Sequence, residues 1–170
     1  VCWGMSNRSV LVRVPLGWTS GEDMCHKANN IEPLTARDYS IKQTVEMRSP
    51  DASADIYQLL AGLCVACRHG FEMANAEAEA ERTFADGDIH DPKNAERYAT
   101  LAQLPDSCAA SADCLERQRK VYEEYDVFSP AMIDGIIKQL RSYNDRTLRQ
   151  EIEGKEMMME KLVRQYFHCG

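Results

Sequence analysis

The chain has 170 residues, of which 44% are hydrophobic, so it can form the core of one ordinary domain or of part of a larger one. Its formal net charge of -7 argues against a protein that coats nucleic acid or an anionic membrane. No run approaches the roughly 18 apolar residues of a membrane helix and no secretory signal pattern opens the chain, so we expect a cytoplasmic protein.

A first strand is predicted in residues 7–15, where valines alternate with other side chains and Pro15 ends the run. Residues 16–43 show no sustained period and are rich in Gly, Asn, Asp and Ser, which is typical of a long surface loop. A loop of this length inside a compact domain is often functional.

A second strand is predicted in residues 43–50, QTVEMRSP. Side chains alternate along a strand, so Glu46 and Arg48 project to the same face, where they can meet a ligand or each other. Two strands make a poor sheet by themselves, and we therefore expect further strand partners outside this sequence.

Helical periodicity begins after the second strand, with Asp51 or Ser53 as the expected N-cap of a largely buried helix. The charged stretch NAEAEAERTFADGD, residues 75–88, indicates a solvated face within a long surface excursion. Three further helices are predicted, the second of them with Ser129 as its cap and Pro130 at its first position. They cover residues 109–125, 130–149 and 155–167.

Seven cysteines, an odd number without a repeating spacing, favour reduced thiols over a disulfide framework. Cys64, Cys67 and His69 suggest a zinc or redox motif, but the pair lies in an apolar helix without a second CxxC, so we interpret both cysteines as core residues. Weaker metal candidates without an identifiable partner are Cys25, His26, His90 and His168.

Four segments, in this order, carry a family resemblance: WGMSNRSVLVRVP, VEMRSPDASADIYQLLAGL, LAQLPDS and VFSPAMIDGIIKQL. Together they resemble the C-terminal part of the catalytic domain of glutamine synthetase, over roughly residues 3–145. The resemblance implies an α+β fold, with a few antiparallel strands followed by a mainly helical body. It also implies a ligase that makes glutamine from glutamate, ammonia and ATP through γ-glutamyl phosphate.

The resemblance assigns roles to four residues. Arg8 matches the arginine that contacts the transferring phosphoryl group, and Arg13 matches one that holds the ATP phosphates. Arg48 matches the arginine that binds the glutamate side-chain carboxylate, and Glu46 matches a ligand of the Mg²⁺ or Mn²⁺ ion that bridges the nucleotide phosphates. The chemistry agrees, because guanidinium groups are bidentate donors to anionic oxygens and these hard cations prefer carboxylates.

With these roles, the sequence divides into active-site strands with their intervening loop in residues 1–50, a helical part in residues 51–150 and a C-terminal helical tail in residues 151–170. The tail segment EMMMEKLVRQYF could contact another subunit, since Met157, Met158 and Met159 cannot all face one core, and family members form homo-oligomers. The family's other metal ligands lie upstream of its matching segments, so we expect the isolated chain to be inactive.

Alternatives remain open at this level. A γ-glutamyl-amine ligase of the same superfamily would use an amine in place of ammonia, and the residues that select ammonia are mostly absent from this chain. A non-catalytic assembly or regulatory module could retain the fold, and an ion-pair network at a sheet edge could account for the four charged residues. A cysteine-rich, zinc-binding helical domain is a third possibility.

Overall fold

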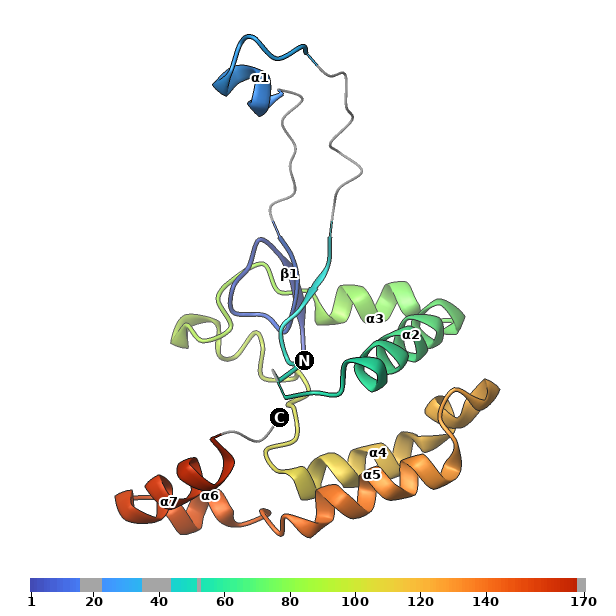
Figure 1. The fold of residues 1–170 in the computed structure, drawn as a ribbon, viewed down its shortest axis with the longest axis vertical. Coiled ribbons are helices and arrows are strands. Elements are labelled where there is room, and N and C mark those ends of the chain that lie inside the picture. The colour runs from blue at the N-terminus through green and yellow to red at the C-terminus, as the bar shows by residue number, and fades with distance from the viewer. Residues whose placement is uncertain (16–22, 35–43, 52, 168–170) are drawn as a thin grey trace. The chain divides into compact units, whose positions relative to one another are not determined.

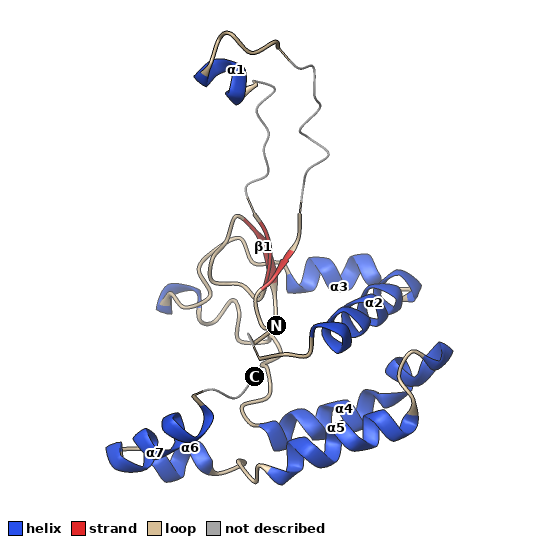
Figure 2. Cartoon of the chain, viewed as in Figure 1, coloured by secondary structure: helices blue, strands red, loops and turns tan. Residues whose placement is uncertain are grey.

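The computed structural model describes residues 1–15, 23–34, 44–51 and 53–167 (Figure 1). The chain forms two compact units. Unit 1 comprises Val1–Ser49 and Glu77–Ala102, and unit 2 comprises Pro50–Ala76 and Gln103–Gly170. Helices predominate and the strands are short (Figure 2), which confirms the predicted α+β class. None of the described helices is long and apolar enough to cross a membrane. The predicted three-segment organisation stays a prediction.

Unit 1 contains a three-stranded sheet in the order β1-β2-β3. Strands β2 and β3 pair antiparallel, as predicted, whereas β1 was not predicted and pairs with β2 in parallel. Strands β2 and β3 are shorter than the two predicted runs, because only a few residues of each run pair with a neighbouring strand. Their bounds are Trp3–Met5 for β1, Val12–Val14 for β2 and Glu46–Met47 for β3.

Residues 77–102 return to this sheet. The Ala85 N–H donates to the Trp3 carbonyl at 2.8 Å, and the rings of Trp3 and Phe84 lie 4.9 Å apart. A Cβ on Gly4 would collide with the Ala85 carbonyl oxygen, so this close approach requires glycine. The resulting core consists of buried Cys2, Val10, Ala85, Tyr98 and Leu101.

Two short helices in unit 1 were not predicted. Helix α3, Ala76–Thr83, has no buried residue, so the expectation of a solvated face is confirmed for this helix. Helix α1, Met24–Ala28, lies within the predicted loop. It forms because the Asp23 side chain accepts from the N–H groups of Cys25 and His26, at 3.0 and 3.2 Å. Residues 16–22 and 35–43 of that loop lie outside the described residues.

The first helix of unit 2, α2, spans Ile56–Glu72 and is capped by Asp55, which accepts from the N–H groups of Tyr57 and Gln58. The predicted caps Asp51 and Ser53 are therefore wrong. The prediction of a largely buried helix is wrong as well, because Val65 is its one buried residue.

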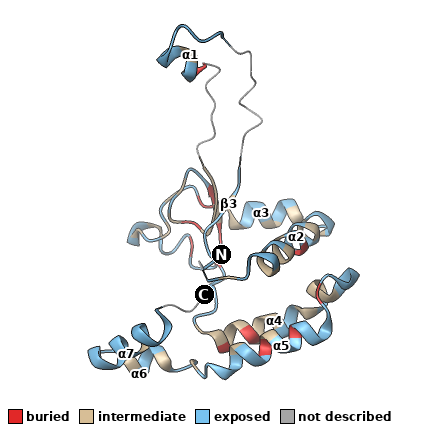
Figure 3. Ribbon diagram, viewed as in Figure 1, coloured by how far each residue is buried: buried red, intermediate tan, exposed pale blue. Residues whose placement is uncertain are grey.

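The core of unit 2 lies mainly between α4, Cys108–Glu123, and α5, Pro130–Ser142 (Figure 3). Its buried residues are Val65, Ala112, Phe128, Ile133 and Ile137. The predicted Ser129 cap is confirmed, because its hydroxyl accepts from the Met132 N–H at 3.2 Å. The predicted helix over residues 130–149 ends early, and α6, Leu148–Ile152, and α7, Glu156–Tyr166, follow.

Asp145 caps the N-terminus of α4 from a distant position in the sequence. Its carboxylate accepts from the N–H groups of Cys108 at 2.7 Å and Ala109 at 3.0 Å. Partial burial by itself raises the pKa of the Asp145 carboxyl, but these hydrogen bonds outweigh burial and hold the pKa below its ordinary value of 3.8. The ionised carboxylate therefore stabilises the folded state.

We predict that Asp145→Ala lowers the free energy of unfolding of unit 2 by about 1 kcal/mol at pH 7, as for other lost helix caps. A carboxyl with a lowered pKa in the folded state stabilises above its unfolded pKa, and this contribution is lost as the pH falls through the folded pKa. The difference between parent and variant should therefore shrink below about pH 3.8. Urea unfolding followed by far-ultraviolet circular dichroism at several pH values measures this difference in the free energy of unfolding.

The exposed Asp106 provides the matched control, since Asp106→Ala removes a carboxylate close to the same helix end without removing the cap. A difference between parent and Asp145→Ala that stays constant with pH would contradict the role of the ionised carboxylate.

Candidate active site

The centre of the candidate site is an ion pair between two strands. Arg13 on β2 lies directly opposite Glu46 on β3, and the Arg13 Nη2 is paired with the Glu46 Oε2. The two side chains are 21% and 39% exposed, so a ligand from solvent can reach them. The structure thus joins two of the four residues predicted from the sequence.

Arg48 approaches the same carboxylate from the side of β3. Its Nε lies 3.5 Å from the Glu46 Oε1, which confirms that these two residues share a strand face. The Arg48 Nη1 also donates to the carbonyl oxygens of Arg8 and of Val10, the latter at 3.3 Å. Its backbone N–H donates to the Leu11 carbonyl at 3.0 Å. Arg48 therefore links β3 to the segment before β2.

Arg8 lies on this segment but joins the group through its backbone. Its carbonyl accepts from Arg48, while its side chain is exposed and forms no ion pair with any described residue. The structure therefore brings Arg13, Glu46 and Arg48 together and leaves the Arg8 guanidinium open to solvent. An exposed guanidinium can bind an anion without first breaking an internal pair.

Asn7 holds the segment that carries Arg8. Its Nδ2 donates to the carbonyls of Ala85 at 3.0 Å and Gly87 at 2.8 Å. Its Oδ1 accepts from the N–H and the hydroxyl of Ser9, at 2.9 and 2.8 Å. Both ends of the amide are thus in use. Asn7 was not predicted as a site residue, although an Asn-x-Ser spacing beside a candidate arginine is a recognisable signal of a local side-chain turn.

One nitrogen of the group has no acceptor. The Arg13 Nε is buried, and the described part of the chain offers it no hydrogen-bond partner. Buried polar groups in folded proteins are nearly always paired, by protein, water or ligand. Two guanidinium groups around one carboxylate also leave a net positive charge at this place on an acidic protein. The arrangement is thus suited to an anionic ligand.

The described residues do not form a complete metal site. They contain no group of three or more His, Cys, Asp or Glu side chains that could hold an ion. Glu46 can supply one carboxylate ligand, and both of its oxygens face arginines in this structure. A divalent cation bound at Glu46 would therefore need ligands from other parts of the protein.

The cysteine and histidine candidates do not assemble. Cys64 and Cys67 are exposed, so the interpretation of both as core residues is wrong; Val65 is the buried residue of α2. His26 is occupied locally, with its Nδ1 at 2.5 Å from the Glu32 carbonyl. His90 is exposed, and His168 lies outside the described residues.

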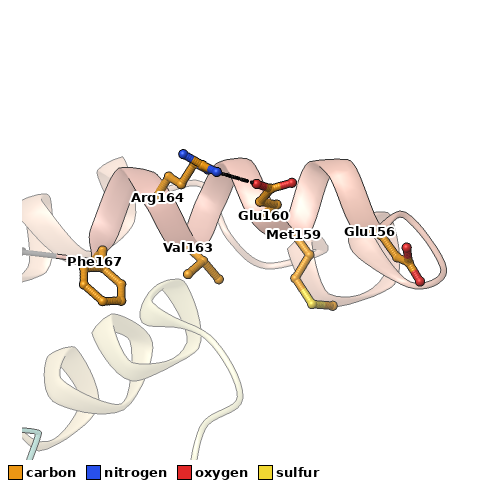
Figure 4. A pocket seen from close by; sticks show the side chains of 6 residues that line it. All are labelled: Glu156, Met159, Glu160, Val163, Arg164 and Phe167. Carbon is orange, nitrogen blue, oxygen red and sulfur yellow. Dashed lines mark hydrogen bonds and ion pairs between the residues drawn. The ribbon is translucent and has the colours of Figure 1, made fainter.

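Helix α7 carries a second exposed surface. Met159, Val163 and Phe167 follow one side of the helix, and Glu160 forms an ion pair with Arg164 at 2.7 Å beside them (Figure 4). Met157, Met158 and Met159 are all at least 37% exposed, so the expectation that they do not share one core is confirmed.

The chain is thus an α+β protein in which two arginines surround a carboxylate on neighbouring strands. Comparison with known families finds a match: the family model of the glutamine synthetase catalytic domain matches residues 1–160. The chain therefore belongs to the glutamine synthetase catalytic-domain family, a family of ligases.

One curated relative is a glutamine synthetase from Streptomyces coelicolor (strain ATCC BAA-471 / A3(2) / M145), which is 32% identical over 102 residues. The aligned part covers 60% of this chain and 20% of the relative. The chain thus spans only a small part of that enzyme's length. No solved structure matches it.

We predict that Asn7→Ala lowers the free energy of unfolding of unit 1 by about 2 kcal/mol or more, because it removes four hydrogen bonds and leaves partly buried groups unpaired. Both tryptophans lie in Val1–Ser49, so urea unfolding followed by tryptophan fluorescence reports on unit 1.

Asn29→Ala is the matched control, since the exposed Asn29 side chain accepts one long hydrogen bond, from the Ile31 N–H at 3.3 Å. Equal stability losses in the two variants would show that Asn7 is no special support of the Arg8 segment.

Proposed function

We propose that this chain forms part of the ATP, glutamate and metal site of a glutamate–ammonia ligase that acts through γ-glutamyl phosphate. The observation that carries the proposal is the group of Arg13, Glu46 and Arg48, found in a chain of the glutamine synthetase catalytic-domain family. An ion-pair network without catalytic function would not need an Arg13 Nε and an Arg8 guanidinium that find no partner among the described residues.

The proposed roles divide the anionic groups of the reaction among three arginines. Arg13 binds ATP phosphates, Arg8 contacts the phosphoryl group in transfer, and Arg48 binds the glutamate side-chain carboxylate. Phosphoryl transfer depends mainly on positioning and on stabilising charge that develops on phosphate oxygens. Arg13 and Arg48 suit this work because strand pairing and the Arg48 contacts with Arg8 and Val10 fix their positions beforehand.

The carboxylate of Glu46 keeps the arginines in place when no substrate is bound. Because Arg13 and Arg48 both approach Glu46, the three side chains are positioned by each other. In the proposal Glu46 also contributes one ligand to Mg²⁺ or Mn²⁺. Such an ion, when bound, would neutralise negative charge on the nucleotide phosphates.

The remaining parts of the site are proposed to come from outside this chain, which spans 20% of its Streptomyces relative. A single carboxylate does not make a complete metal site, so the 170-residue chain alone should lack synthetase activity. The exposed side of α7 supports assembly of the full-length protein into a homo-oligomer. A ligase that uses ATP, glutamate and ammonia would work in the cytoplasm.

We predict that the full-length protein forms glutamine from glutamate, ammonia and ATP with Mg²⁺ or Mn²⁺. Arg8→Ala and Glu46→Ala should each lower turnover roughly a hundredfold or more, the scale for loss of a group that stabilises the transition state. Arg82→Ala is the matched control, because Arg82 is an exposed arginine of unit 1 that pairs with Glu79 on α3. Biosynthetic and γ-glutamyl transfer assays measure the effect.

Several outcomes would contradict the proposal in separate ways. Full activity of Arg8→Ala and Glu46→Ala would show that the residue roles are wrong although the family holds. Turnover with an amine but not with ammonia would identify a γ-glutamyl-amine ligase instead. Tight self-association without nucleotide binding would identify a non-catalytic assembly module. Glutamine formation by the isolated chain would refute the expected inactivity.

A further inference from the structure

Unit 2 contains an open depression of about 580 Å³ whose floor is one face of α4. Ala110, Asp113, Cys114 and Arg117 line it from this helix, at the three- and four-residue spacing that places side chains on one face. Residues 103–106 form one wall. Arg146, just before α6, and Arg149, within α6, also line the depression. Its volume is within the usual range of small-molecule sites.

Three arginines from two segments of unit 2 line this depression, and two of them have no carboxylate partner among the described residues. The Arg117 Nη2 donates to the Cys114 Sγ at 3.0 Å. Arg149 forms no hydrogen bond or ion pair with any residue of the described ranges. Arg146 uses its Nη2 on the Asp113 carboxylate at 2.6 Å, which leaves its other N–H groups available. Most of the guanidinium donors are therefore unused.

The acidic groups at the same place do not cancel these charges. Asp113 is shared between Arg146 and Arg141, and the hydrogen bonds from these two arginines hold the pKa of its carboxyl below the ordinary value. Arg141 is also paired with Glu116 at 2.5 Å. Asp106, on the rim, is the remaining carboxylate of the lining. Arg117 and Arg149 thus face one unpaired acid, and a positive excess remains on a chain with net charge -7.

The N-terminus of α4 does not contribute to this positive excess. Its first N–H groups are occupied by the Asp145 carboxylate and, at Ala110, by the Ser107 hydroxyl at 3.1 Å. Any anion in the depression would be held by the guanidinium groups. Planar guanidinium groups bind phosphate and carboxylate oxygens in pairs of hydrogen bonds, and several of them together select a multiply charged anion over chloride.

We propose that this depression binds a small, multiply charged oxyanion through Arg117, Arg146 and Arg149. The shared chemistry is a cluster of anionic oxygens, which a phosphorylated compound or a polycarboxylate can supply. The inference does not depend on the proposed ligase function, because all of the residues involved belong to unit 2 and the experiment needs no turnover.

Cys114 provides a reporter inside the depression. The purified 170-residue chain is treated with iodoacetamide, a neutral reagent, and the labelling rate of each cysteine is read by peptide mass spectrometry. Pyrophosphate and citrate are the probes, and sodium chloride matches the ionic strength. The exposed Cys67 of α2 is the internal reference. We expect pyrophosphate or citrate to slow labelling of Cys114 severalfold and in a saturable manner, with Cys67 unaffected.

The double variant Arg117→Ala/Arg149→Ala should lose this protection. Lys161→Ala/Arg164→Ala is the matched control, because it removes the same charge from exposed positions of α7. This variant should keep the protection of Cys114. The rate ratio with and without probe is compared within each variant, since loss of Arg117 alters the surroundings of Cys114. Arg149→Ala alone, which breaks no internal contact of a described residue, should weaken protection even if the double variant misfolds.

Protection by pyrophosphate alone would identify phosphate as the ligand chemistry, and protection by citrate as well would identify a general oxyanion site. Both results support the proposal. Lack of saturable protection in the parent chain, or protection that persists in Arg149→Ala and in the double variant, would overturn it.

Discussion

The pairing of Arg13 with Glu46 across two strands is the contact on which the candidate site depends. Strand register places these residues opposite each other, and the alternation of side chains then brings Arg48 to the same carboxylate. The Arg13 and Glu46 side chains are only partly exposed, and ion pairs near the surface contribute about 0–1 kcal/mol to stability. The main consequence of the pair is therefore positional, because two guanidinium groups are held at one place.

This arrangement depends on a second layer of contacts that carry no charge. Asn7 and Ser9 connect the segment of Arg8 to residues 85–89, with the Ser9 hydroxyl accepting from the Ile89 N–H at 3.1 Å. Arg48 then attaches β3 to that same segment. The polar network thus links three stretches that are far apart in the sequence. Neutral hydrogen bonds of Asn7 and Ser9 fix the backbone of the Arg8 segment, and the charged Arg48 guanidinium adds a further hydrogen bond to it.

The sequence predicted the shared face of Glu46 and Arg48 and the start of α5, because these follow from local alternation and capping, whereas the α+β class was implied by the family resemblance. It did not predict β1, α3 or the return of residues 77–102, because these depend on contacts such as that of Ala85 with Trp3. The cap from Asp145 was missed for the same reason, since it lies 37 residues from Cys108. Cys64 and Cys67 were placed in a core because their helix is apolar, whereas α2 buries only Val65.

The most direct test of the account is to exchange the charges of the central pair in the full-length protein. Arg13→Glu/Glu46→Arg preserves an ion pair between β2 and β3 but puts a carboxylate where ATP phosphates are proposed to bind. We predict a modestly lower unfolding midpoint than that of the parent, because the cross-strand pair is kept while Arg48 loses its carboxylate partner, together with loss of glutamine formation. Turnover at the parent level would contradict the account and show that the pair serves only the structure of the sheet.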